Sequence, residues 1–287
     1  MYRKFLISGT LGDCYVILRK LQDYLKCKNL DERNCYVSYA SDTIEHHSLI
    51  KEMFQELSYL NFSEEVLMFD DNTGLKSIID QFSGEFLNHT WNGLVFESEK
   101  VQACDAKIDT FSQLGKQISS GAIKVGLQVH SGKKNKNEKV IHHSFVNKLV
   151  MQLKQYNFEV YLFGTDKSFV QKINNNDNLY DLVGELNFNN WLENLRDMNF
   201  LVTPEGFPLF YALDHNVQCI GFYEYNYIFD RIPPHWRNNG IFYCSRNHTI
   251  YSRLNRRIRK SLSITNFVHL PPPESIANHI INKFAYL

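Results

Sequence analysis

The chain has 287 residues, which exceeds the usual size of a single domain and favours one large domain or two modest ones. With 44% hydrophobic and 22% charged residues, and only 14 Gly and 7 Pro, the composition predicts a folded globular protein and excludes a disordered or collagen-like chain. Lys and Arg together number 31, as do Asp and Glu, so no overall charge attracts a polyanionic partner.

The sequence contains no segment that predicts membrane insertion or secretion. Its apolar runs fall far short of the roughly 18 to 20 residues that span a bilayer, and its first residues lack a signal-peptide pattern. The six cysteines form no Cys-x-x-Cys pair, which argues against a zinc site or a disulfide framework. We therefore expect a cytoplasmic protein that could also lie at a membrane surface.

Apolar, β-rich segments alternate with helical patterns almost from the first residue, as is typical of βαβ units with a parallel sheet. In the first half of the chain, the pattern predicts strands at 2–8, 34–40, 65–69 and 93–96 and helices at 14–26, 43–57 and 75–82. Ser41 and Asp42 are both candidate caps for the helix at 43–57.

The apolar periodicity fades near residue 115 and returns at Ile123, which predicts a domain boundary between residues 118 and 119. The second half repeats the alternation, with strands at 123–130, 158–163, 199–203 and 218–222 and helices at 143–155, 167–174, 188–198 and 209–213. Three prolines at 271–273 precede a last helix at 274–284. We expect domains at 1–118 and 119–270, with 271–287 packing back toward the N-terminal domain.

The predicted fold class is α/β, with two Rossmann-like domains that face a central cleft. Ligands of such sheets bind outside the carboxyl ends of the strands, so the site is expected in that cleft.

The first predicted strand passes into a helix through the loop Ser8-Gly-Thr-Leu-Gly-Asp13. Its glycines permit positive φ angles and the close approach of a ligand, while Asp13 lies where a carboxylate can cap free helix amides. Capping alone is therefore an alternative to a catalytic role. The loop is not Gly-x-Gly-x-x-Gly, and no Gly-Lys-Ser/Thr occurs, which disfavours a dinucleotide site or a P-loop.

Residues 190–222 predict a helix, a strand, a Glu-Gly loop, a second helix and a second strand. Together with Gly9-Thr-Leu-Gly-Asp13, this order resembles a glycosyltransferase of the B-type fold. It is most similar to the ADP-heptose:lipopolysaccharide heptosyltransferase family, over nearly the whole chain.

The resemblance implies a role for each matching residue. Asp13 falls on the aspartate that acts as general base on the acceptor hydroxyl, beside the acceptor-side residues Gly9, Thr10 and Gly12. The implied donor-binding residues lie in the second domain: Ser131, Gly132 and Lys139 toward the phosphates, Thr165 and Asp166 toward the nucleoside, and Glu205, Gly206, Phe207 and Pro208 in the last loop. Taken alone, Lys139 is also compatible with a solvated loop.

The last loop departs from that family, whose usual pattern is Asp-Ser/Thr-Gly-Pro-x-His. Here it reads Pro204-Glu-Gly-Phe-Pro-Leu209, which looks like the Glu-Gly-Phe-Gly loop of retaining B-type transferases, although their second glutamate falls on Leu213. Helix amides and a lysine offset the charge of a departing diphosphate, so we expect no metal and no cofactor besides the nucleotide-sugar substrate. The adjacent histidines at 46–47 and 142–143 would point about 100° apart on a helix, so they are expected to be surface or boundary residues and not a shared metal site.

Residues 231–273 carry eight Lys or Arg and no Asp or Glu. Arg256 and Arg257 in this segment are candidate acceptor-binding residues for an anionic glycan, a lipid-linked saccharide, a membrane surface or a nucleic acid. The sequence predicts a glycosyltransferase that moves a sugar from a nucleotide-activated donor to a hydroxyl. The alternatives are a transferase acting on a nucleic-acid base and a non-catalytic nucleotide- or glycan-binding relative.

Overall fold

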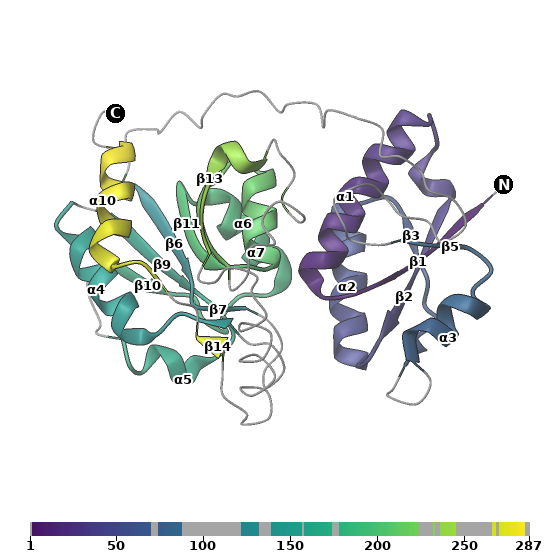
Figure 1. Ribbon diagram of the computed structural model, residues 1–287, viewed down its shortest axis with the longest axis horizontal. Coiled ribbons are helices and arrows are strands. Elements are labelled where there is room, and N and C mark those ends of the chain that lie inside the picture. Colours follow the sequence, from purple (N-terminus) through teal and green to yellow (C-terminus); the bar gives the residue numbers. More distant parts are fainter. Residues whose placement is uncertain are drawn as a thin grey trace. The chain divides into compact units, whose positions relative to one another are not determined.

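The computed structural model of the chain consists of two compact α/β units, Met1–Gln113 and Leu114–Leu287 (Figure 1). The structure describes residues 2–69, 74–87, 122–131, 139–156, 158–173, 178–223, 232, 236–244, 266–267 and 270–284. The predicted boundary at residues 118 and 119 and the predicted strand at 93–96 lie outside these residues. Among the helices described, none is long and apolar enough to cross a membrane.

The first unit contains one parallel sheet, in the order β3-β2-β1-β5, with β4 also pairing with β2. Its elements are β1 (Arg3–Ser8), α1 (Leu11–Cys27), η1 (Glu32–Asn34), β2 (Cys35–Ser41), α2 (Ile44–Leu57), β3 (Asn61–Phe62), β4 (Leu67–Met68), α3 (Gly74–Gln81) and β5 (Glu85–Phe86). One face of α1 is fully buried because Cys14, Leu18, Leu21 and Leu25 recur at helical spacing.

The starts of α1 and α2 differ from the sequence expectation. Helix α1 begins at Leu11, and its cap is Thr10. Helix α2 is capped by Thr43, whose side-chain oxygen accepts from the amide of His46, so neither predicted cap was right. Ser41 instead bonds to the backbone of Thr43 and holds the turn between β2 and α2.

The second unit contains a six-stranded parallel sheet in the order β10-β9-β6-β11-β12-β13. Its strands are β6 (Lys124–Gln128), β9 (Glu159–Phe163), β10 (Leu179–Asp181), β11 (Phe200–Pro204), β12 (Gln218–Tyr223) and β13 (Gly240–Cys244). A small separate sheet is formed by β7 (His130–Ser131), β8 (Lys139–Val140) and β14 (Asn266–Phe267). The order of the large sheet is that of a Rossmann fold, which confirms the predicted α/β class.

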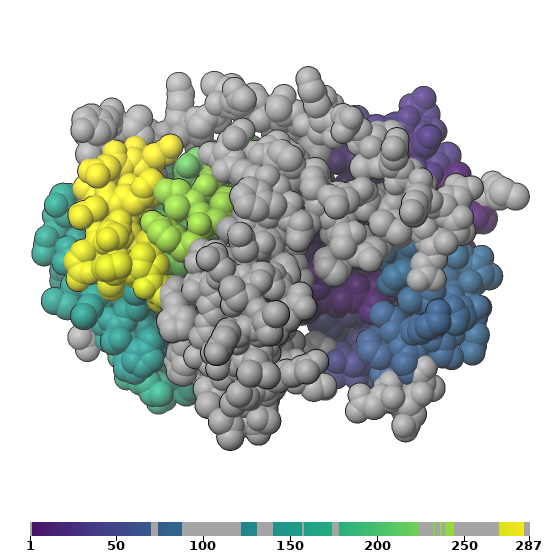
Figure 2. All heavy atoms as spheres, in the orientation of Figure 1, coloured from purple at the N-terminus to yellow at the C-terminus, as the bar shows by residue number. Residues whose placement is uncertain are grey.

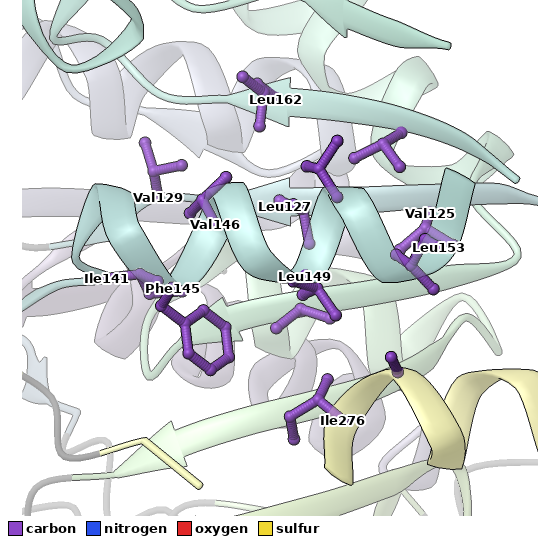
Figure 3. Close-up of a cluster of buried hydrophobic side chains, with 14 of the residues drawn as sticks. Val125, Leu127, Val129, Ile141, Phe145, Val146, Leu149, Leu153, Leu162 and Ile276 are labelled. Atoms are coloured by element: carbon purple, nitrogen blue, oxygen red, sulfur yellow. The ribbon is translucent and has the colours of Figure 1, made fainter. Parts of the chain in front are cut away.

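The helices of the second unit cover both faces of the large sheet (Figure 1). They are α4 (His143–Lys154), α5 (Lys167–Val170), α6 (Phe188–Asp197), α7 (Phe207–Asp214) and α10 (Pro273–Phe284), with the short η2 (Trp236–Asn239). Val125, Leu127 and Val129 point toward α4, where they join one buried cluster with residues of β9, β11 and β12 (Figure 3). On the opposite face, α7 lies so close to β12 that a Cβ on Gly221 would meet Leu209 at 2.8 Å.

The C-terminal helix belongs to the second unit. Ile276, Ala277 and Ile280 of α10 are fully buried in the cluster beneath α4, and the yellow surface of α10 lies beside the teal surface of this unit (Figure 2). The described residues of this segment, 271–284, thus include a helix that packs in the core of the second unit. The physical reason is that the apolar face of α10 completes the core over this sheet.

Candidate functional site

The loop after β1 holds Asp13 at the start of α1. Thr10 is the N-cap, and Asp13, three residues on, completes a capping box. The Oδ2 atom of Asp13 accepts from the amide of Thr10 at 3.1 Å and from its hydroxyl at 2.8 Å. Both of these bonds are accepted by Oδ2. The carboxylate thus has the structural role that the sequence allowed, in a position compatible with the catalytic one.

Gly9 is required at this turn for two reasons. Its φ angle is +132°, which side-chain-bearing residues rarely adopt, and a Cβ there would lie 2.9 Å from the Cβ of Asp13. Gly12, the other predicted acceptor-side glycine, is buried in the first turn of α1. It therefore packs inside the helix start and does not line an open surface.

Sequence reasoning missed two residues beside this loop. The buried phenol of Tyr39, on β2, donates to the carbonyl of Gly9 at 2.7 Å and lies 2.8 Å from Nδ1 of His46. Because the single phenolic proton goes to Gly9, Nδ1 of His46 is the donor in the second bond. Burial raises the pKa of Tyr39, so the phenol stays protonated. Part of this arrangement could have been inferred from the sequence. Parallel pairing of the two predicted strands β1 and β2 places Tyr39 beside Ile7, close to the loop that follows β1.

His47 is also buried, with 5% of its surface exposed, in contrast to the surface or boundary position expected from the sequence. Its ring packs against those of Tyr39 and Phe62. The reason is that position 47 lies on the face of α2 that carries Ile50 and Phe54 into the core.

In the second unit, the predicted nucleoside-side residues follow β9. Nε2 of His130 lies 2.9 Å from the hydroxyl of Thr165 and accepts from the Thr165 amide at 3.4 Å. Asp166 caps α5, because its Oδ1 accepts from the amide and the hydroxyl of Ser168 at 3.0 and 2.7 Å. The contacts of His130 with Thr165 therefore fix this turn. Asp166 already caps α5, so contact with a ligand would be a second role for it.

The predicted phosphate-side residues Ser131 and Lys139 pair through their backbones in the antiparallel strands β7 and β8. Gly132 lies between them in sequence and falls outside the described residues, as do Arg256 and Arg257. The structure therefore joins the two ends of the predicted phosphate loop at the carboxyl end of β6.

The last predicted loop connects β11 with α7. Glu205 is buried, with 5% of its surface exposed, and its amide donates to the carbonyl of Phe222 at 2.9 Å. Gly206 is the N-cap of α7 and provides no side-chain cap, while Pro208 stands in the first turn. The start of α7 therefore has no side-chain cap, and the helix dipole places a partial positive charge there.

Aromatic packing fixes the position of α7. Phe207 is 3% exposed and its ring centroid lies 5.4 Å from that of Trp191, so Phe207 contributes its backbone to the loop and its side chain to the core. Leu213, at the place of the second glutamate, is also buried, and the neighbouring Asp214 accepts from the indole nitrogen of Trp236 at 3.1 Å. Position 213 therefore offers no acidic group, and Asp214 holds the indole of Trp236.

These elements meet at one point of the second sheet. Strands β6 and β11 are neighbours, and the connections that follow them lead to opposite halves of the sheet. Such a topological switch point is where ligands bind in open α/β sheets. His130 and Ser131 follow β6, and Glu205 to Pro208 follow β11, so the predicted phosphate-side loops border the switch point. No cluster of three or more His, Cys, Asp or Glu side chains within the described ranges could hold a metal ion.

Comparison with known proteins relates the chain to glycosyltransferases by fold. No family model and no curated protein sequence matches it. A family 9 glycosyl transferase from Veillonella parvula is 10% identical, with coverage of 100% of this chain and 98% of that one and a TM-score of 0.59. The E. coli ADP-heptose lipopolysaccharide heptosyltransferase II is 12% identical, with coverage of 98% of both chains and a TM-score of 0.47. The chain therefore has the B-type glycosyltransferase fold that its sequence predicted.

Proposed function

We propose that this protein is a glycosyltransferase that moves a sugar from a nucleotide-activated donor to a hydroxyl of an anionic glycan or lipid-linked saccharide. The observation that carries the proposal is the uncapped N-terminus of α7 at the switch point of a Rossmann-type sheet. A helix start of this kind binds phosphate through its amides and its dipole. The fold shared with a family 9 glycosyl transferase supports the same reading.

In this proposal, the second unit holds the donor. The amides at Gly206 and Phe207, with Ser131, Gly132 and Lys139, stabilise the diphosphate as negative charge grows on it during bond cleavage. Thr165 and Asp166 approach the nucleoside, and Glu205 lies beneath the sugar. Neither a metal nor a further cofactor is assigned a role.

The first unit supplies the acceptor side. Asp13 accepts the proton of the acceptor hydroxyl as the new glycosidic bond forms, while the amide and the hydroxyl of Thr10 hold the carboxylate in place. Arg256 and Arg257, which follow the donor-binding loops in sequence, attract an anionic acceptor.

Ligand binding tests the donor half of the proposal directly. ADP, UDP, GDP or CDP should raise the melting temperature of the protein in a concentration-dependent way, because a ligand of the native state stabilises it. Lys139→Ala should weaken the effective nucleotide by about 1 to 3 kcal/mol in calorimetry, the scale of a charge-assisted hydrogen bond. Lys154→Ala, at the exposed end of α4, is the matched control and should leave the affinity unchanged. Equal nucleotide affinity of the two variants would indicate that Lys139 belongs to a solvated loop and does not bind the nucleotide.

A non-catalytic nucleotide-binding protein is the second candidate. It is favoured by the last loop, which has Glu205 where the heptosyltransferase pattern has aspartate and lacks its histidine. A nucleotide-sugar that binds tightly but is neither hydrolysed nor transferred would select this candidate.

A further inference from the structure

Gln128, the last residue of β6, is directed to the face of the second sheet that α7 covers. Side chains alternate between the two faces of a strand, and Val125, Leu127 and Val129 occupy the face toward α4 (Figure 3). Gln128 therefore faces the other side, on which α7 packs against β12. Only 5% of Gln128 is exposed, so its amide is a buried polar group.

Strand register places Gln128 between the two predicted donor-binding turns. It pairs with Phe163, which is followed by the turn of Thr165 and Asp166. On its other side, Leu127 pairs with Val202, so the next position along β11 is Thr203, which precedes the Glu205 loop. Gln128 thus stands at the carboxyl end of β6 and at the switch point itself.

The hydrogen bonds of Gln128 leave one atom unused. Its Nε2 donates to the carbonyl of His130 at 2.8 Å, which fixes the orientation of the amide. Its Oε1 is buried and has no hydrogen-bond partner in the part of the chain that the structure describes. A buried acceptor in this state is unfavourable in the free protein and becomes favourable when a ligand donates to it.

We propose that Oε1 of Gln128 accepts a hydrogen bond from a hydroxyl of the bound nucleotide-sugar, which makes Gln128 a specificity-determining residue. This inference rests on the proposed function of the same site. An amide oxygen only accepts hydrogen bonds and carries a partial negative charge, so it does not pair with the phosphate oxygens, which are also acceptors. Gln128 therefore recognises the hydroxyl-bearing part of the donor, either the ribose or the transferred sugar, while α7 and Lys139 hold the diphosphate.

The test is calorimetric titration of the wild type and of Gln128→Met. The probes are inorganic pyrophosphate, the nucleoside diphosphate among ADP, UDP, GDP and CDP that stabilises the wild type most, and its glucose conjugate. We expect Gln128→Met to bind the hydroxyl-bearing probe at least about tenfold more weakly, the effect of losing a buried hydrogen bond, and to bind pyrophosphate as the wild type does. Loss for the diphosphate and its conjugate alike identifies the ribose, and loss for the conjugate alone identifies the sugar.

Gln218→Met is the matched control, because Gln218 is also in the large sheet but at the amino end of β12, where it donates to Asn239. It should bind every probe as the wild type does. If Gln128→Met does not fold, the side-chain amide resonance of Gln128 in the ¹⁵N-labelled wild type should shift on saturation with the nucleoside diphosphate or its conjugate and not with pyrophosphate.

Four outcomes contradict the inference. Unchanged affinity for all probes in Gln128→Met would mean that water satisfies Oε1, and an equal loss for pyrophosphate would mean general damage to the loop. If the side-chain amide resonance of Gln128 did not shift with the nucleoside diphosphate or its conjugate, the conclusion would be the same as for unchanged affinity. A wild type that binds no nucleoside diphosphate and no conjugate overturns the proposed function, and the role of Gln128 with it.

Discussion

At the scale of single residues, Asp13 combines two roles at one helix start, and stability and turnover separate them. In Asp13→Asn, the side-chain oxygen can still accept from Thr10, so we expect the free energy of unfolding to change by no more than about 1 kcal/mol. Asn cannot take a proton, and loss of a general base lowers kcat by about 10² to 10⁴. Nucleotide-sugar turnover and urea unfolding measure the two effects. Retention of more than about a third of the wild-type rate would place the base elsewhere, with Glu205 the next candidate.

His47 should make the stability of the protein depend on pH. Burial lowers its pKa in the folded state, so in the pH range below about 6.5 the unfolded chain binds the proton more readily than the folded one. The free energy of unfolding should therefore fall as the pH is lowered through that range. In His47→Phe, urea unfolding at about pH 7.5 and 5.5 should show a smaller fall.

The variant still contains His279, whose pKa is also lowered by burial. Some dependence of stability on pH should therefore remain in His47→Phe, and only the difference from the wild type reports on His47. An equal fall in the wild type and in His47→Phe would show that His47 does not titrate differently on folding. The buried Nε2 of His47 has no hydrogen-bond partner among the described residues, so protonation would leave a buried charge there.

At the scale of elements, the turn from β1 to α1 depends on Gly9. Gly9→Ala combines a strained φ angle with a Cβ at 2.9 Å from Asp13, so it should lower the free energy of unfolding by about 1 to 3 kcal/mol and also displace the carboxylate. Gly74→Ala is the control. Its φ of +60° is also positive, but no atom lies within 4 Å of the added Cβ, so only a loss of about 1 kcal/mol is expected.

Turnover distinguishes the two glycine variants. Gly9→Ala should lose activity beyond its loss of stability, whereas Gly74→Ala should keep the wild-type rate. Similar rates for both would show that the close packing of Gly9 on Asp13 has no part in catalysis.

Long, periodic elements were predictable from the sequence, and short paired ones were not. The helix α4, expected at 143–155, is observed at His143–Lys154, and the expected strand at 158–163 is observed as β9. The strands β3 and β5 have two residues each, which is too short for any periodicity. They exist because their backbones pair with β2 and β1, and such pairing depends on residues far away in the chain.

At the scale of the whole molecule, positive and negative charges are equal in number, but residues 231–273 carry only positive ones. Reversing Arg256 and Arg257 to Glu should raise the KM for an anionic acceptor and flatten its dependence on salt, while donor affinity stays the same. The control is the same reversal at Lys148 and Lys154, which are exposed on α4. An equal loss of donor affinity in the arginine variant would assign the segment to the donor.

The sequence by itself determined the α/β class, the two units of alternating strands and helices, and the loop that carries Asp13. These features follow from local patterns, because apolar spacing and turn residues act over a few neighbours. Only the tertiary structure decided the strand order that creates the switch point, the packing of α10 against α4, and the hydrogen bond from Tyr39 to Gly9. It also decided that Oε1 of Gln128 is buried without a described partner. Each of these depends on contacts between distant segments, and burial is a property of the packed fold that local spacing does not specify.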